Sequence, residues 1–320
     1  TGIRTFEVGT GKTYPTPDTV PWSTLKAGDV VNIHYRATPY NSIIAIQGAG
    51  TKENPIVING VTDANGNRPK FDVSNGGVVA SGTSALWSGL DPIHGYQRMG
   101  IITVCNGAGF QYLVSQPKWI RIQNLELCGA NTGDVKGLEK GSTLTLLNGS
   151  SASWYNGAGV YLQSSEDVTI ENCVIYNNTF GVFTMAKGDL LWYANQRVVL
   201  RNNRIYGNGV VGEYYQHNVY MQSTNPVIEG NYIGSLRTGA EGSAYKSRSS
   251  GEIFRYNWVE SHARAIDFVH SEEQANGIAA QPDYKYVHCY GNVILNTSLA
   301  GRFAPTAIHL GGDNGGEDGY

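Results

Sequence analysis

Residues 217–273 read HNVYMQSTNPVIEGNYIGSLRTGAEGSAYKSRSSGEIFRYNWVESHARAIDFVHSEE, and residues 284–296 read YKYVHCYGNVILN. The copies IEGNYI, FRYNWV and CYGNVI align with one asparagine in a single column: Asn231, Asn257 and Asn292. Upstream, VVLRNNRIY adds Asn203 to this column and VTIENCVIY places Cys173 in it. The steps along the column are 30, 28, 26 and 35 residues (203 − 173, 231 − 203, 257 − 231 and 292 − 257). A repeat of this length predicts a solenoid.

The repeat unit is predicted to be a coil of short β-strands. The apolar segments are short, rich in Val, Ile, Tyr and Phe, and bounded by Gly, Asn and Ser, which is typical of strands rather than helix pairs. Asparagine suits a corner between strands because its amide tolerates left-handed backbone and bonds nearby backbone groups. Stacked asparagines can also bond one another along the axis. We therefore predict an all-β fold, a single-stranded right-handed parallel β-helix with loops inserted at its corners.

Composition and charge agree with this class. The chain has 320 residues, with 41 Gly, 20 Tyr and 15% charged residues, and it lacks the runs of Ala, Leu, Glu and Lys that long helices favour. The net charge of −3 argues against a protein that binds nucleic acid electrostatically. The sequence has no run of 18 apolar residues, so no membrane span is predicted. The polar, charge-poor composition and a start at Thr1 rather than Met predict a secreted or cell-surface protein.

One β-helix can absorb all 320 residues, so we predict a single domain over 1–320. Residues 1–35 are expected to cap the first coil, because an open end exposes strand edges and apolar core. Coils follow over 36–320, with long loops at about 81–97 and 130–157. No cap sequence follows the strand at residues 307–310, which predicts end-to-end stacking on another copy as one alternative.

The four cysteines do not indicate a metal site. They are Cys105, Cys128, Cys173 and Cys289, and none forms a C-x-x-C pair. Cys173 and Cys289 are expected to be small buried residues of the coils. Cys105 and Cys128 are candidates for a disulfide in an oxidising compartment, and the sequence leaves their state open.

The candidate functional residues come from aligning the first strands of successive coils: GVYLQSS, NVYMQST, SAYKSRS, AIDFVHS and TAIHLGG. In this alignment Lys246 falls in an apolar column with Leu162, Met221, Phe268 and Leu310. Burying an unpaired ammonium is costly, so either the strand is shifted to turn Lys246 outward or the lysine has a carboxylate partner. The neighbouring column holds Tyr161, Tyr220, Tyr245, Asp267 and His309.

Neighbouring coils lie about 4.8 Å apart, so residues of one column can form a single patch. The patch predicted here contains His217, Tyr220, Tyr245, Lys246, Arg248, Arg264, Asp267, His270 and His309.

The whole-chain pattern resembles the pectate-lyase-like superfamily of right-handed parallel β-helices. More narrowly, residues 217–220 (HNVY) and 246–248 (KSR) look like the motifs of a family of secreted β-helix-repeat proteins. The Lys-Ser pair is similar to that around the catalytic lysine of alginate and chondroitin lyases of the β-helix class. Those lyases carry Arg-His-Gly in the following coil. Here the coil reads AIDFVH over 265–270, and the nearest arginine is Arg264.

The resemblance implies β-elimination on a uronic acid, which needs a neutralised carboxylate, a base for the C5 proton and an acid for the leaving oxygen. Lys246 is the candidate base. Arg248 and Arg264, or alternatively Ca²⁺ held by acidic residues, would clamp the carboxylate. The candidate acids are Tyr220, Tyr245 and His217. The remaining patch residues, Asp267, His270 and His309, are assigned with the two tyrosines to binding an acidic polysaccharide.

Three other interpretations stay open. The patch can bind a carbohydrate without chemistry. Lys246 and Arg248 can simply pair with Glu241, Glu252 or Asp267 as structural ion pairs. The chain can also be a structural or adhesive subunit that assembles end to end. A hydrolase is disfavoured, because it needs two carboxylates about 5–9.5 Å apart and only Asp267 is placed on the patch.

Overall fold

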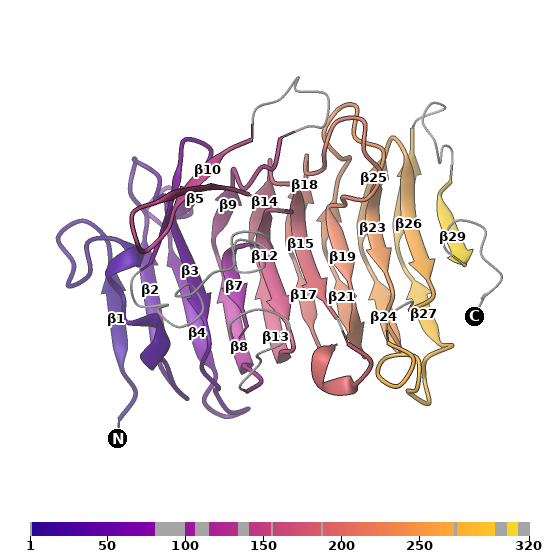
Figure 1. Cartoon of the computed structure of the whole chain (residues 1–320), viewed down its shortest axis with the longest axis horizontal. Helices are drawn as coiled ribbons and strands as arrows, with labels where there is room; N and C mark the ends of the chain where they lie inside the picture. The colour runs from indigo at the N-terminus through magenta and orange to yellow at the C-terminus, as the bar shows by residue number, and fades with distance from the viewer. Residues whose placement is uncertain are drawn as a thin grey trace.

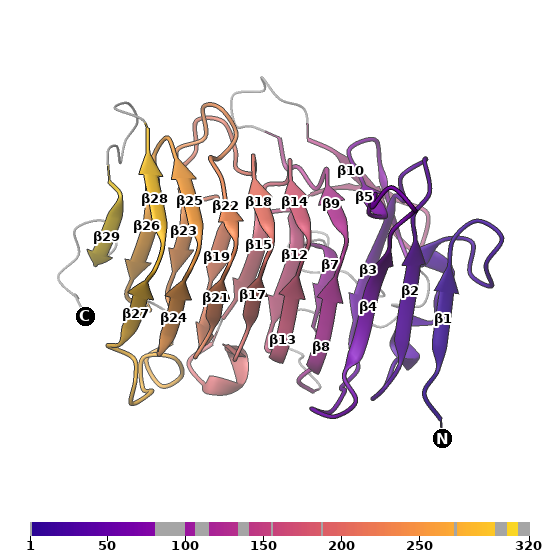
Figure 2. The same cartoon turned by 180° about the vertical axis from the view of Figure 1, so that it is seen from behind.

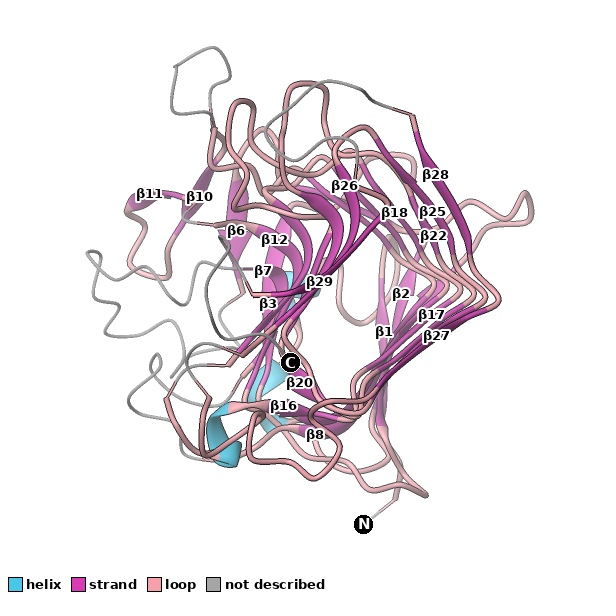
Figure 3. Cartoon of the chain, turned by 90° about the vertical axis from the view of Figure 1, so that its right-hand side faces the viewer, coloured by secondary structure: helices cyan, strands magenta, loops and turns pink. Residues whose placement is uncertain are grey.

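The computed structural model describes residues 2–80, 100–105, 115–133, 141–154, 156–186, 188–271, 274–297 and 306–312. Its strands form three long sheets that run side by side along one axis, with the two termini at opposite ends (Figure 1, Figure 2). Seen along this axis, the strands of successive coils stack behind one another around a common interior (Figure 3). This arrangement confirms the predicted all-β, parallel β-helix.

The first sheet contains, in spatial order, β1 (Thr5–Val8), β2 (Val30–His34), β4 (Ile56–Val61), β8 (Lys118–Gln123), β13 (Glu166–Glu171), β17 (Val199–Arg201), β21 (Val227–Glu229), β24 (Glu252–Arg255) and β27 (Val287–Tyr290), with β16 (Asn195–Gln196) and β20 (Ser223–Thr224) beside it. The third sheet contains β5 (Lys70–Asp72), β9 (Glu126–Cys128), β14 (Val174–Tyr176), β18 (Arg204–Tyr206), β22 (Tyr232–Ile233), β25 (Trp258–Ser261) and β28 (Val293–Asn296).

The second sheet carries the candidate site. It runs through β11 (Ser151–Ser153), β10 (Thr143–Thr145), β6 (Gly77–Val79), β3 (Ser42–Ile46), β7 (Gly100–Val104), β12 (Ala158–Gln163), β15 (Phe180–Met185), β19 (Val219–Met221), β23 (Ser243–Ser247), β26 (Arg264–Val269) and β29 (Ile308–Gly311). All its strand pairs are parallel except that of β10 with β11, which is antiparallel. These two form an antiparallel hairpin inside the predicted loop at 130–157, whereas the predicted loop at 81–97 lies outside the described residues.

The interior is a stack of apolar side chains, because alternate residues of each strand point inward. One inward column of the first sheet runs through Ile58, Ile122, Ile170, Leu200, Ile228 and Phe254. All six are fully buried. Each such side chain contributes about 1.5–3 kcal/mol by leaving water, so the coils hold together mainly through this shared core.

Residues 1–35, predicted as a cap, contain two strands of the first sheet, β1 and β2, and two short turns between them. Two 3₁₀ turns, η1 (Pro17–Thr19) and η2 (Trp22–Thr24), lie against β3. Trp22 is fully buried there, and its indole N–H donates to the carbonyl of Pro17 at 2.7 Å. A further 3₁₀ turn, η5, spans Leu191–Tyr193. Among the described residues no helix is long and apolar enough to span a membrane.

The last described strand is open to solvent. Ile308 and Leu310 of β29 are 43% and 66% exposed, whereas the equivalent inward residues Ile266 and Phe268 of β26 are buried. End-to-end assembly through this coil stays a prediction.

The asparagine column predicted from the repeat is a continuous hydrogen-bonded ladder. The side-chain oxygen of Asn231 accepts from the backbone and the side-chain amide of Asn203, at 2.9 and 3.0 Å. The side-chain oxygen of Asn257 accepts the same two hydrogen bonds from Asn231, and that of Asn292 accepts them from Asn257. Upstream, the backbone N–H of Cys173 donates to Asn203 at 2.9 Å. Each ladder amide therefore satisfies buried polar groups of the preceding coil.

The sequence predicted that the ladder asparagine itself would adopt the left-handed conformation at this corner. In the structure the residue before it does so instead. That residue has a positive φ in five successive coils: Asn172, Asn202, Gly230, Tyr256 and Gly291. Asparagine and glycine enter this region readily, whereas a tyrosine does so at a cost. The ladder asparagine instead uses its amide to bridge the coils.

Candidate functional site

The strand β23 is shifted by one residue relative to the alignment of the sequence motifs. Lys246 pairs in register with Tyr220 of β19 and Asp267 of β26, while Tyr245 pairs with Val219 and Ile266. A slip of one residue exchanges the two faces of a strand. Lys246 therefore leaves the apolar column and stands on the outward face.

The resulting outward column runs along the second sheet, and its residues change from aromatic to charged along the axis. Its members in order are Tyr161, Phe183, Tyr220, Lys246, Asp267 and His309. The rings of Phe183 and Tyr220 stack at 5.4 Å with 3° between their planes. The Lys246 ammonium lies 5.9 Å from the centre of the Tyr220 ring. An aromatic stack thus passes into an ionic cluster at Lys246.

Tyr245, predicted as a candidate acid and a binding residue, is placed wrongly by the sequence alignment. It is fully buried in the core, and its hydroxyl donates to Oε1 of Glu252 at 2.5 Å. The hydroxyl of Ser247 donates to the other oxygen of the same carboxyl group. Burial raises the pKa of Glu252 to about 7, against the opposing effect of these two hydrogen bonds.

Asp267 is the centre of the ionic cluster. Its side chain is 1% exposed. Oδ2 lies 2.7 Å from Nη1 of Arg264 and 3.7 Å from Nζ of Lys246, and Oδ1 lies 2.7 Å from Nδ1 of His309. The Ser243 hydroxyl adds a bond to Oδ2 at 3.3 Å. Of the three carboxylates considered as partners for Lys246, the structure selects Asp267.

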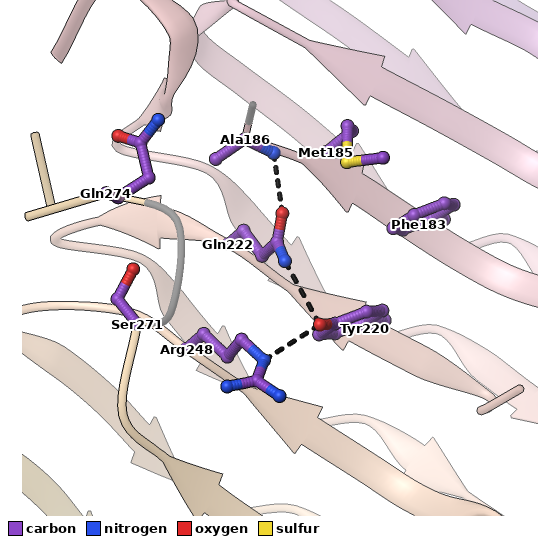
Figure 4. Close-up of a pocket in the computed structure, with 8 residues that line it drawn as sticks. All are labelled: Phe183, Met185, Ala186, Tyr220, Gln222, Arg248, Ser271 and Gln274. Carbon is purple, nitrogen blue, oxygen red and sulfur yellow. Dashed lines mark hydrogen bonds between the residues drawn. The ribbon is translucent and has the colours of Figure 1, made fainter. Parts of the chain in front are cut away.

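Tyr220 connects this cluster to a small cavity. Its hydroxyl oxygen accepts from Nε of Arg248 at 2.8 Å and from Nε2 of Gln222 at 3.1 Å, as Figure 4 shows. Gln222 in turn accepts from the backbone N–H of Ala186 at 2.6 Å. Because the oxygen already accepts two bonds, the phenolic proton remains to be donated.

The cavity measures about 130 Å³ and is lined by Phe183, Met185, Ala186, Tyr220, Gln222, Arg248, Ser271 and Gln274. Ligand pockets are commonly about 300–1,000 Å³, so this one has room for a substituent rather than a whole sugar chain. Arg248 is the charged residue among those that line it, and its Nη1 donates to the carbonyl of His270 at 2.5 Å.

The predicted patch is therefore assembled in part. Lys246, Arg264, Asp267 and His309 meet directly, and Tyr220 and Arg248 adjoin them. His217 is 3% exposed; its Nδ1 accepts from the backbone N–H of Ser243 at 2.9 Å, and its ring packs against Tyr220. It holds the strands rather than facing solvent. His270 reaches the site through its backbone carbonyl.

Sequence reasoning missed the neighbours that orient these groups, namely Phe183, Gln222, Ser243, Ser271 and Gln274. Gln222 follows Tyr220 by two residues, so it points to the same side of the strand. This spacing was the one available signal for it. Ser271 and Gln274 come from the chain after β26, where no repeat marks their position.

The cysteines carry no reactive site among the described residues. All four thiols are free, so Cys105 and Cys128 are not bridged. Cys105, Cys128 and Cys173 are buried, and burial raises the pKa of each to about 12. Cys289, expected to be buried, is exposed because its coil is the last of its sheet.

The described residues do not suit a Ca²⁺ ion at the cluster. Calcium takes six to eight oxygen ligands, whereas both oxygens of Asp267 already meet Arg264, His309, Lys246 and Ser243. No group of three or more His, Cys, Asp or Glu side chains gathers elsewhere in the described ranges.

Comparisons with known proteins address the fold. A search of curated proteins finds no match. Among solved structures, an alginate lyase from Paenibacillus sp. str. FPU-7 aligns with a TM-score of 0.45 and 13% identity, over 96% of this chain and 99% of that one. A GH136 lacto-N-biosidase from Eubacterium ramulus aligns with a TM-score of 0.41 and 11% identity, over 92% of this chain and 68% of that one.

The family comparison is more direct. The model of the right-handed β-helix region matches residues 108–280, which is more than half of the chain. The parallel sheets and the asparagine ladder lie largely within this range. The chain therefore belongs to the right-handed β-helix family.

Proposed function

We propose that this protein acts on an acidic polysaccharide by β-elimination, at the outward face of β19, β23 and β26. The observation that carries the proposal is the outward position of Lys246 between the Tyr220 ring and Asp267. Arg248 follows it by two residues and lies against the same tyrosine. A primary amine, a phenol and a guanidinium in one place match the three tasks of the reaction.

The reaction can be assigned to these groups step by step. The Arg248 guanidinium neutralises the uronate carboxylate. Lys246, as the neutral amine, takes the C5 proton and becomes an ammonium, and the electron pair of the broken C5–H bond forms the double bond between C4 and C5. The C4–O bond breaks with its electrons on the leaving oxygen, which takes the phenolic proton of Tyr220. The products are one chain end with a hydroxyl and one with an unsaturated sugar.

Asp267 has a positioning role in this proposal. Its 1% exposure and its bonds to Arg264 and His309 leave it poorly placed to attack a sugar. It instead positions Nζ of Lys246 from one side while the Tyr220 ring faces it from the other, and it pairs with the ammonium that forms when Lys246 takes the C5 proton. Glycoside hydrolysis usually needs a second carboxylate, and β19, β23 and β26 carry no other acidic residue.

The proposed substrate class favours a location outside the cell. Acidic polysaccharides are components of cell walls and extracellular matrices, so the proposal includes a secreted or cell-surface protein. The motif resemblance to secreted β-helix proteins agrees with this. A requirement for Ca²⁺ remains a prediction to be tested with the activity.

The test is an assay for the unsaturated product. Alginate, pectate and glycosaminoglycans are each incubated with the protein, with and without Ca²⁺, and the ultraviolet absorbance of the new conjugated double bond is followed. A rise on one of these polymers is expected, and mass spectrometry should show products at the mass of the unsaturated oligosaccharide. Products carrying one added water per cleavage would instead indicate a hydrolase, and no product from any polymer would contradict the proposal.

A further inference from the structure

Glu252 is an acidic residue in the apolar interior of the β-helix. It opens β24, is 1% exposed, and shares the core with Phe254 and Phe268. The ring of Tyr245 packs on both phenylalanines, at 4.7 and 6.1 Å between centres. Buried carboxyl groups are rare unless they are paired, so this one calls for a reason.

The carboxyl group binds both inward neighbours of Lys246. Oε1 accepts from the Tyr245 hydroxyl at 2.5 Å, and Oε2 accepts from the Ser247 hydroxyl. Alternate residues of a strand point to opposite faces. When Tyr245 and Ser247 are both held inward, the residue between them has to point outward.

The alternative register explains why such a hold is needed. A slip of β23 by one residue places Lys246 in the apolar interior and moves Tyr245 to the surface. Tyr245 is amphipathic and Ser247 is small, so neither fixes the register by burial of apolar area alone. The carboxyl group of Glu252 accepts both hydroxyl protons only in the observed register.

We propose that Glu252 is the positioning residue that fixes the register of β23 and thereby holds Lys246 on the outward face. The importance of Lys246 rests on the proposed function, whereas the hold itself does not. The titratable groups that face Glu252 are Tyr245 from β23 and Cys289 from β27. The described groups that bind its carboxyl are hydroxyls rather than cations, so an ionised Glu252 has no opposite charge to compensate it there.

The buried carboxyl group should therefore cost stability as the pH rises, although its two hydrogen bonds favour the ionised form. Burial raises the pKa of Glu252 from its usual value of 4.5 to about 7. The folded protein thus binds the proton more tightly than the unfolded chain, so stability is fully present below pH 4.5 and falls as the pH rises through 7. At pH 8 the neutral form is reduced about tenfold relative to the ionised form, since one pH unit above the pKa corresponds to that ratio.

The experiment compares wild type with Glu252→Gln, which keeps the shape and stays neutral. Lysines are acylated briefly at pH 6 and pH 8, and mass spectrometry gives the labelling of Lys246 relative to exposed Lys118 of β8 in the same molecule. The two proteins should agree at pH 6. At pH 8 the relative labelling of Lys246 should be lower in wild type than in Glu252→Gln, by up to about tenfold, because a slipped β23 carries Lys246 into the interior. The urea midpoint should fall from pH 6 to pH 8 in wild type and stay level in Glu252→Gln.

The double variant Tyr245→Phe/Ser247→Ala removes both hydroxyls and provides a second arm. It should lower Lys246 labelling below wild type already at pH 6, because a slipped β23 carries Lys246 into the interior. Equal labelling of all three proteins at both pH values would overturn the proposal. None of these readouts needs a substrate, so a protein without lyase activity can still show the hold. Conversely, an active lyase whose Lys246 labelling ignores Glu252 would overturn only this inference.

Discussion

Two columns of side chains run along the same β-helix and follow opposite rules. In the asparagine ladder one residue type recurs at Asn203, Asn231, Asn257 and Asn292, and each member bonds the coil before it. In the outward column of the second sheet the residue type changes at almost every coil, from aromatic rings to Lys246, Asp267 and His309. The backbone spacing is common to both columns.

The difference between the two columns distinguishes residues that build the β-helix from residues that form the candidate site. A repeated amide satisfies repeated backbone groups, and it makes each coil resemble the last. Unlike groups placed at the same spacing create a local arrangement that occurs once, with an amine, a carboxylate and a guanidinium within one or two coils. In a β-helix, the coils where a column stops repeating are therefore where function should be sought.

The largest loss of stability is expected at Asp267, the buried carboxylate of the outward column of the second sheet. Asp267→Ala removes a fully buried carboxylate and leaves Lys246, Arg264 and His309 facing one another. Removing one partner of a buried ion pair costs about 3–5 kcal/mol, so the free energy of unfolding should fall by about that amount. Urea denaturation measures it. A loss below about 1 kcal/mol, typical of a surface pair, would contradict the central role given to Asp267.

A smaller loss is expected in the ladder. Asn231→Ala leaves the backbone N–H and side-chain amide of Asn203 without their acceptor, and an unsatisfied buried donor costs about 1–3 kcal/mol. Asn292→Ala is the matched control, because Asn292 ends the ladder in a partly exposed position. Its urea midpoint should shift less. Equal losses at both positions would mean that burial does not set the strength of the ladder.

These two columns also show what the sequence could predict. The ladder was visible because asparagine recurs at steps near 28, which predicted a solenoid, and the short apolar segments between the asparagines predicted its β-coils. A second ladder of Asn178, Asn208 and Asn218 was missed, because its last step is only 10 residues (218 − 208) and breaks the period.

The sequence alignment placed β23 in the wrong register, so it assigned Tyr245 to the patch although that side chain lies in the core. Local pattern placed Tyr245 beside Tyr220, since both are aromatic and follow an apolar or small residue. The structure pairs Lys246 with Tyr220 instead. The contact that decides between the two registers comes from Glu252, on the next sheet, and strand periodicity carries no information about such a contact.

Tyr220 lies where the outward column of the second sheet passes from aromatic to charged residues. Tyr220→Phe tests whether its hydroxyl contributes to stability and to catalysis. Arg248 and Gln222 would each lose their bond to it, which should cost about 1–2 kcal/mol of stability. The rate of product formation should fall about 10²-fold or more if the phenol donates the leaving-group proton. Tyr206→Phe, a stacked tyrosine of the third sheet, is the control. An unchanged rate would remove Tyr220 from the mechanism.

The smallest effect concerns the corner of the ladder, and it is a gain. Tyr256 has φ of 57° where other coils have asparagine or glycine. Tyr256→Asn should stabilise the fold by about 0.5–1 kcal/mol, because asparagine enters the left-handed region at lower cost. Thermal unfolding of the variant measures this. A decrease in stability would mean that the edge-to-face contact of Tyr256 with Tyr290 outweighs the backbone strain.

The most direct test of the central claim compares two lysines on the substrate that the polymer panel identifies. Lys246→Ala removes the amine from the outward column of the second sheet, whereas Lys118→Ala removes an exposed amine from β8 of the first sheet. The account predicts a loss of about 10²–10⁴-fold in the rate of double-bond formation for Lys246→Ala and an unchanged rate for Lys118→Ala, with both variants folded by circular dichroism. A folded Lys246→Ala protein that forms the unsaturated product at the wild-type rate would contradict it.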